Sequence, residues 1–142
     1  MKKIVISLST ALERRQHILS EFGKKNVDFD FFDALTTEPA AIFAQALHLN
    51  IDEQVLTKGE VACFMSHAYL WKKMVDDNTP YMAIFEDDIY LGEDVKEFLT
   101  DNQWIDPSWH LIKLEEFTHR IALGKKVKAF NDHNNRAIFQ LK

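Results

Sequence analysis

The segment YMAIFEDDIY, residues 81–90, places three acidic residues directly after an apolar run. The apolar residues predict a buried strand at 81–85, and Glu86, Asp87 and Asp88 would then stand at its carboxyl end. In open α/β sheets, ligands bind outside the carboxyl ends of the strands. A solvated acidic turn would also explain three neighbouring acids, so the rest of the chain has to decide between a site and a surface turn.

The chain before this segment alternates between strand and helix patterns. A β-branched apolar run predicts a strand at 4–8, and apolar residues at near-helical spacing predict a helix that ends at Gly23. A second strand is expected at 27–32, ending at Asp33. This order is typical of a βαβ unit, so the sequence predicts an α/β fold with a parallel sheet flanked by helices.

The strongest helix prediction covers residues 58–76. Thr57 and Glu60 match a capping box, and an apolar stripe at helical spacing follows them. On this pattern Cys63 should point into the core as an inert thiol. Weaker patterns predict helices at 39–48 and 94–99 and strands at 109–114 and 136–141. With no repeat and no linker, residues 1–142 are predicted to form a single domain.

Composition excludes several classes of function. The net charge is −5 over 142 residues, which makes nucleic acid an improbable partner, and the one cysteine allows no intrachain disulfide. No apolar run approaches the roughly 20 residues that a membrane span needs. A cytoplasmic protein is expected. Residues 113–142 are basic, which suits contact with a phosphorylated substrate, peripheral contact with anionic lipid at the inner membrane, or simply a solvated surface.

The acidic segment suits a metal ion if the strand persists through it. Alternate side chains of a strand point to opposite faces, so Glu86 and Asp88 would share one side and Asp87 would take the other. Two carboxylates on one side suit a hard divalent cation such as Mg²⁺ or Mn²⁺, which can bridge a diphosphate.

Four segments, in order, resemble glycosyltransferase family 25, the family of lipopolysaccharide and lipooligosaccharide biosynthesis galactosyltransferases and their relatives. The segment 85–88, FEDD, resembles the EDD form of the family's metal-binding D-x-D motif. The others are Ile6-Ser7-Leu8 with Glu13-Arg14-Arg15, FDFFDA at 29–34 and GEVACFMSH at 59–67. A weaker match covers 109–114.

The resemblance implies a GT-A-type fold with a nucleotide-binding sheet. It also implies metal-dependent, inverting transfer of a hexose, usually galactose, from a UDP-sugar to a saccharide or glycolipid acceptor. Mn²⁺ is the usual metal, which Asp88 and Glu86 would hold. Leu8 and Ser9 would line the nucleotide pocket.

Further roles follow from the same resemblance. Asp33 would contact uracil or ribose, and Asp87 the ribose or the sugar. Arg14 or Arg15 would contact phosphate, although exposed helix charges are an equal alternative. Inversion requires a general base. Glu115 or its neighbour Glu116 is one candidate. His67 is another, and it lies on nearly the same helix face as Glu60, which more simply caps the helix.

Family members usually continue beyond this point, so the C-terminal part of the fold is expected to be missing. Residues 1–142 would then be the N-terminal, donor-binding portion, and an open strand edge could favour a homodimer. Two alternatives remain: a non-catalytic binding or assembly module, and an unrelated phosphohydrolase or phosphoacceptor domain. The last needs an aspartate where the chain has Leu8-Ser9-Thr10, and neither a G-x-G-x-x-G motif nor a P-loop is present.

Overall fold

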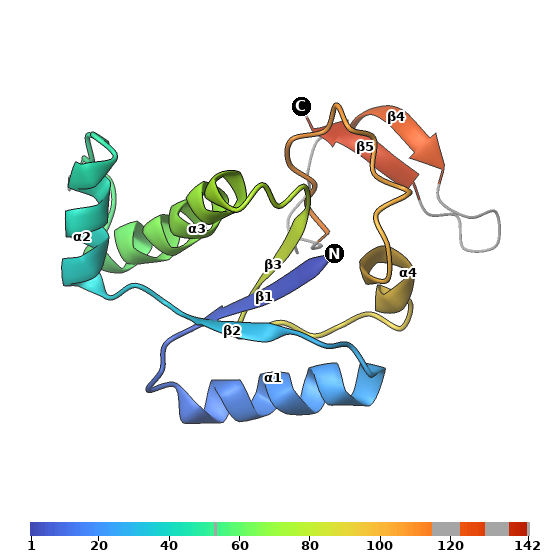
Figure 1. Ribbon diagram of the computed structural model, residues 1–142, viewed down its shortest axis with the longest axis horizontal. Helices are drawn as coiled ribbons and strands as arrows, with labels where there is room; N and C mark the ends of the chain where they lie inside the picture. The colour runs from blue at the N-terminus through green and yellow to red at the C-terminus, as the bar shows by residue number, and fades with distance from the viewer. Residues whose placement is uncertain (53, 115–122, 130–136, 142) are drawn as a thin grey trace. The chain divides into compact units, whose positions relative to one another are not determined.

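The computed structural model describes residues 1–52, 54–114, 123–129 and 137–141. The chain divides into two compact units, Met1–Asp106 and Pro107–Lys142, which are considered separately (Figure 1). In the first unit the order of elements is β1 (Lys2–Ser7), α1 (Leu12–Lys25), β2 (Asp30–Asp33), α2 (Thr37–Ala46), α3 (Lys58–Asp76), β3 (Met82–Glu86) and α4 (Val95–Leu99). The second unit contains an antiparallel pair, β4 (Leu123–Ala129) and β5 (Ala137–Leu141).

The first unit is built on a parallel three-stranded sheet in the order β2-β1-β3. Ser7, the last residue of β1, pairs with Asp33 of β2, and Ile6 pairs with Glu86 of β3. Because all three strands run the same way, their carboxyl ends meet at one edge. The predicted α/β fold, with a parallel sheet flanked by helices, is confirmed.

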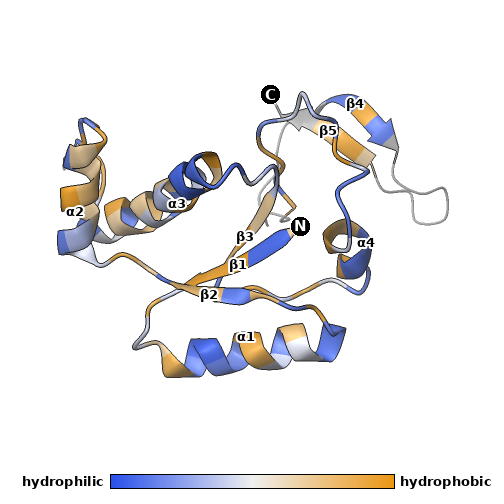
Figure 2. Cartoon of the chain, in the orientation of Figure 1, coloured by the Kyte–Doolittle hydropathy of each residue, from blue (hydrophilic) through white to orange (hydrophobic). Residues whose placement is uncertain are grey.

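Helices cover both faces of this sheet. Side chains of β1 alternate between the faces. Val5 packs with Ile18 and Phe22 of α1, whereas Ile4 and Ile6 pack with Leu70 of α3. Figure 2 shows the corresponding sequence pattern: α1 carries both apolar and hydrophilic residues, and β1 changes from hydrophilic to apolar along its length.

Hydrogen bonds hold helix α3 at its N-terminus and near its middle. Thr57 and Glu60 form the predicted capping box, in which each side chain accepts a hydrogen bond from the backbone N–H of the other residue. Ser66 is fully buried: its hydroxyl donates to the Ala62 carbonyl at 2.8 Å and accepts from the Leu35 N–H at 2.9 Å. The latter bond joins α3 to the loop that follows β2.

Several predicted boundaries and one predicted strand are wrong. The second strand begins at Asp30 rather than at residue 27. Helix α1 does not end at Gly23 but continues to Lys25, and Asn26 ends it in the left-handed conformation with φ of 50°. Helix α2 covers Thr37–Ala46 rather than 39–48. Residues 109–114 form no strand, and β4 lies later in the chain. Helices at 58–76 and 94–99 and the last strand are confirmed within a residue.

Within the described residues, none of the helices combines the length and the apolar character that crossing a bilayer requires.

Candidate functional site

The site begins where the carboxyl ends of β1 and β3 lie side by side. Asp87, the first residue after β3, is buried and accepts hydrogen bonds on both carboxylate oxygens. Ser7 donates through Oγ to Oδ2 at 2.7 Å, and Arg14 of α1 donates through Nη1 to Oδ1 at 2.9 Å. Asp87 therefore connects the sheet edge to α1.

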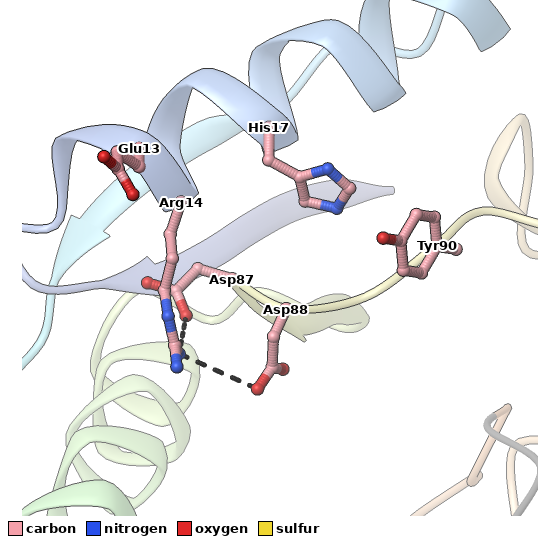
Figure 3. A pocket seen from close by; sticks show the side chains of 6 residues that line it. All are labelled: Glu13, Arg14, His17, Asp87, Asp88 and Tyr90. Carbon is pink, nitrogen blue, oxygen red and sulfur yellow. Dashed lines mark hydrogen bonds and ion pairs between the residues drawn. The ribbon is translucent and has the colours of Figure 1, made fainter.

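Asp88 lies on the same side but stays in solvent. Its side chain is 60% exposed, and Oδ2 lies 3.7 Å from Nη1 of Arg14 (Figure 3). The Arg14 side chain is itself 59% exposed. Its hydrogen bond to Asp87, with the negative charges of Asp87 and Asp88, raises the pKa of Arg14 above its usual value. The Arg14 guanidinium is thus held at the surface, and some of its N–H groups are not used in these two contacts.

A shallow pocket of about 260 Å³ opens beside these groups. It is lined by Asp87, Asp88 and Tyr90 from the segment after β3 and by Glu13, Arg14 and His17 from α1 (Figure 3). Glu13, His17 and Tyr90 were not among the site residues predicted from the sequence. For Glu13 and His17 there was a usable signal: they are four residues apart, which puts both on one face of α1.

His17 and Tyr90 form the far wall of this pocket. The Nε2 atom of His17 lies 2.8 Å from the carbonyl oxygen of Ile89, which holds the loop after β3 against α1. The two rings meet edge to face with centroids 4.8 Å apart, and Tyr90 is largely exposed. An exposed aromatic ring beside charged groups offers a surface on which a base or a sugar ring can stack.

Glu86 faces away from this pocket, towards α3. Its Oε1 atom lies 3.7 Å from Sγ of Cys63 and 3.4 Å from Nε2 of His67. The strand ends at Glu86, so the alternation that would have placed Glu86 and Asp88 on one side does not continue. Instead Asp87 and Asp88 both contact Arg14, and Glu86 contacts α3.

The prediction that Cys63 is a core residue is wrong, because Cys63 is exposed. The buried residues of α3 closest to this position are Ala62, Met65 and Ser66, which leaves Cys63 at the edge of the buried stripe. Partial desolvation of the sulfur and the nearby Glu86 carboxylate raise the pKa of the Cys63 thiol. In this structure the thiol donates to Glu86.

His67 has a different carboxylate partner from the one considered in the sequence. Glu60 accepts from the N–H and the hydroxyl of Thr57, and these bonds lower the pKa of Glu60. It is therefore a capping residue. His67 faces Glu86 instead, with its side chain 23% exposed.

Arg15 joins the ends of β1 and β2. Its guanidinium forms an ion pair with Asp33 and donates to the carbonyls of Ser7 at 3.0 Å and Leu8 at 3.1 Å. It also lies 4.7 Å from the centroid of the Phe31 ring. Arg15 is thereby occupied by internal contacts, whereas Leu8, Ser9 and the Asp33 carboxylate remain exposed at the same sheet edge.

Of the predicted site residues, Glu115 lies outside the described residues, as does its alternative Glu116.

Comparison with known proteins gives consistent results. The model of glycosyltransferase family 25, described as an LPS biosynthesis protein family, matches residues 1–142. The lacto-N-neotetraose biosynthesis glycosyltransferase LgtE of Neisseria meningitidis serogroup B is 44% identical over 75% of this chain. The lipooligosaccharide biosynthesis protein lic2B of Haemophilus influenzae is 37% identical over 89%, and LgtB of Neisseria gonorrhoeae is 43% identical over 96%. The matches cover 39%, 50% and 51% of these relatives, so the chain spans about half of their length or less.

Proposed function

The chain belongs to glycosyltransferase family 25, and from this premise we propose that it is the donor-binding portion of a GT-A-like enzyme. The enzyme transfers a hexose, with galactose as the first candidate, from a UDP-sugar to a lipooligosaccharide saccharide with inversion of configuration. One observation carries the proposal. Asp88 and Arg14 stand exposed at the carboxyl edge of a parallel α/β sheet, beside a pocket, which is where such sheets bind nucleotides.

The carboxylates fit a hard divalent cation. Asp88 and Glu86 are each more than half exposed and keep oxygen lone pairs available, which suits Mn²⁺ or Mg²⁺. Because Glu86 faces α3 in this structure, it would have to turn towards Asp88 for the two to hold one cation, and Asp88 is therefore the main ligand in this proposal. When bound, such a cation neutralises negative charge on the diphosphate leaving group. Asp87 differs from both, since its two oxygens already accept from Ser7 and Arg14. Its part in the proposal is to hold Arg14, and a contact with ribose or sugar would require it to give up one of these bonds.

Arg14 is the residue that binds phosphate in this proposal. Asp87 fixes one side of its guanidinium, and the remaining N–H groups face solvent beside Asp88. A planar guanidinium with free donors binds phosphate oxygens well. Leu8 and Ser9 line the nucleoside side of the same edge. Asp33 accepts from the uracil or ribose, and Arg15 acts by holding Asp33 and the ends of β1 and β2 in place.

Two residues are proposed for the general base, which takes the proton from the acceptor hydroxyl. His67 lies at the sheet edge with its Nε2 atom directed at Glu86, an arrangement in which a carboxylate orients the imidazole. Glu115 is the second candidate.

The test is calorimetric titration of UDP into the protein in the presence of Mn²⁺, then with EDTA, and then with the Asp88→Asn variant. We expect EDTA to abolish binding. We expect Asp88→Asn to weaken it by about tenfold or more, since even residues behind a metal ligand contribute that much to affinity. The matched control is Asp30→Asn, an exposed carboxylate at the opposite end of the strands. UDP affinity that is unchanged by EDTA and by Asp88→Asn would contradict the proposal.

A further inference from the structure

A second cluster of potential ligands lies on the α3 side of the sheet edge. It consists of Cys63 and His67 from α3 and Glu86 from the end of β3, and we call it the thiol cluster. Their ligand atoms all lie within 4.8 Å of one another. We propose that the thiol cluster is a binding site for a divalent cation that accepts sulfur and nitrogen ligands, with Zn²⁺ as the best fit.

The distances in the cluster match a tetrahedral zinc site. Zinc bonds of about 2.3 Å to sulfur and about 2.0–2.1 Å to nitrogen and oxygen, at tetrahedral angles, place sulfur and oxygen about 3.6 Å apart and nitrogen and oxygen about 3.4 Å apart. The structure has 3.7 Å between Cys63 Sγ and Glu86 Oε1, and 3.4 Å between His67 Nε2 and the same oxygen. Only the sulfur and the imidazole nitrogen need to approach each other.

The backbone holds the three ligands in place. Cys63 and His67 are four residues apart on α3, so they share one face of the helix. That helix is capped at Thr57 and packs on the sheet through Leu70. Glu86 is the last residue of β3 and pairs with Ile6 of the central strand. Rigid elements therefore carry all three ligands.

The chemistry of the donors selects the ion. Thiolate and imidazole favour Zn²⁺ over the hard ions Mg²⁺ and Mn²⁺, which prefer oxygen. Three protein ligands leave a fourth position for water, and exposure of Cys63 and partial exposure of Glu86 give the ion a way in. Zinc binds cysteine as the thiolate, so binding should release a proton from Cys63.

The thiol cluster does not include Arg14 or its two acidic partners. Asp87 and Asp88 contact Arg14 rather than α3. It shares Glu86 and His67 with the proposed transfer reaction. An ion bound there would occupy both residues, so Zn²⁺ should inhibit transfer.

The test uses Co²⁺, a spectroscopic substitute for Zn²⁺, titrated into the intact protein without nucleotide. Cobalt bound to a thiolate gives a charge-transfer band in the near ultraviolet. Because Cys63 is the one cysteine of the chain, such a band reports on this residue alone. We expect the band to saturate at one Co²⁺ per chain and to disappear when Zn²⁺ is added. The intensity of the band at saturation should rise in direct proportion to the protein concentration, as expected for a site within one chain.

Three variants test the ligands. Cys63→Ser should abolish the band, and His67→Gln and Glu86→Gln should each weaken Co²⁺ binding by about tenfold or more. All three side chains lie at the surface, and far-ultraviolet circular dichroism checks that each variant is folded. The absence of a band in folded wild-type protein would overturn the proposal. So would a band whose affinity is unchanged in both His67→Gln and Glu86→Gln, or one that requires two chains per ion.

The same samples separate this proposal from the proposed function. Asp88→Asn should weaken UDP binding by about tenfold or more and keep the cobalt band. Cys63→Ser should lose the band and keep UDP binding with Mg²⁺. A band without UDP binding would refute nucleotide binding alone, and UDP binding without a band would refute the thiol cluster alone.

Discussion

The carboxylate of Asp87 is enclosed by the protein, while that of Asp88, one residue later, lies in solvent. Asp87 accepts from a serine hydroxyl and from a guanidinium, and neither bond involves a ligand. Hydrogen bonds that involve a charged group contribute about 1.5–3 kcal/mol each, and a buried group left without its partner costs about 1–3 kcal/mol. Adjacent residues of the same charge can therefore have different effects on stability.

Replacement of Asp87 should destabilise the protein. We expect Asp87→Ala to lower the free energy of unfolding by about 1–3 kcal/mol, because the buried Ser7 hydroxyl loses the shorter of its two hydrogen bonds and Arg14 loses its carboxylate partner. Asp88→Ala, an exposed neighbour, should change it by no more than about 0.5 kcal/mol. Urea denaturation of the two variants measures both values. Equal effects at the two positions would show that Asp87 does not have the internal role described here.

At the scale of residues, the sequence located the acidic segment but not the direction of its side chains. The rule of alternation applies only while a strand lasts, and β3 ends at Glu86. Asp88 then turns to Arg14, a residue far away in the sequence. The partners of Glu86 were also missed. They lie on α3, and a contact between α3 and the end of β3 cannot be predicted from a local sequence pattern.

Among the elements, α3 bears Cys63 and His67, two of the three residues of the thiol cluster. Its capping box satisfies backbone N–H groups that the first turn would otherwise leave without partners. We expect Thr57→Ala to lower the free energy of unfolding by about 1 kcal/mol, the usual cost of losing a cap. Thermal unfolding measures this. Thr79→Ala, a change of the same type beyond the end of α3, is the matched control, and an equal loss there would contradict the role of the cap.

Glu60, the second residue of the capping box, should make the stability of the folded protein depend on pH. Bonds from Thr57 lower the pKa of Glu60 in the folded protein. The stability that ionised Glu60 contributes is therefore present above its unfolded pKa, about 4.3, and is lost as the pH falls through the lower folded value. Glu60→Gln can accept the same bonds but does not titrate.

This dependence is measured as the difference in unfolding temperature between wild type and Glu60→Gln. We expect the wild type to lose its advantage over the variant on going from pH 7 to pH 3. A difference that stays constant over this range would show that Glu60 does not titrate with a lowered pKa.

Local signals explain which elements could be predicted. Helix α3 has a capping box and a long apolar stripe, and both of its predicted ends are correct. The apolar residues of 109–114 resembled a strand, but a strand forms only where a partner is available, and that information is not local. The end of α1 shows a smaller error of the same kind: Asn26, three residues beyond Gly23, adopts the left-handed conformation.

On the scale of the whole molecule, the hydrophobic clusters formed by the described residues all lie in Met1–Asp106. We therefore expect a chain of residues 1–106 to fold cooperatively on its own. Its unfolding temperature should lie within about 4–8 °C of that of residues 1–142, the shift that about 1 kcal/mol produces in a domain of this size. Calorimetry and circular dichroism of the two chains test this. A shortened chain without a cooperative transition would show that residues 107–142 are needed for the core.

The parallel pairing of β1 with β3 has a consequence for biosynthesis. Ser7 and Asp87 are 80 residues apart, so at about 5–20 residues per second the ribosome delivers the second partner about 4–16 s after the first. In that interval β1 and β2 can pair, but one edge of β1 stays open and is exposed to aggregation. Asp87, the residue that holds Arg14 in place, follows directly after the strand that closes this edge. The nascent chain thus acquires its acidic site only when its most vulnerable edge has just been covered.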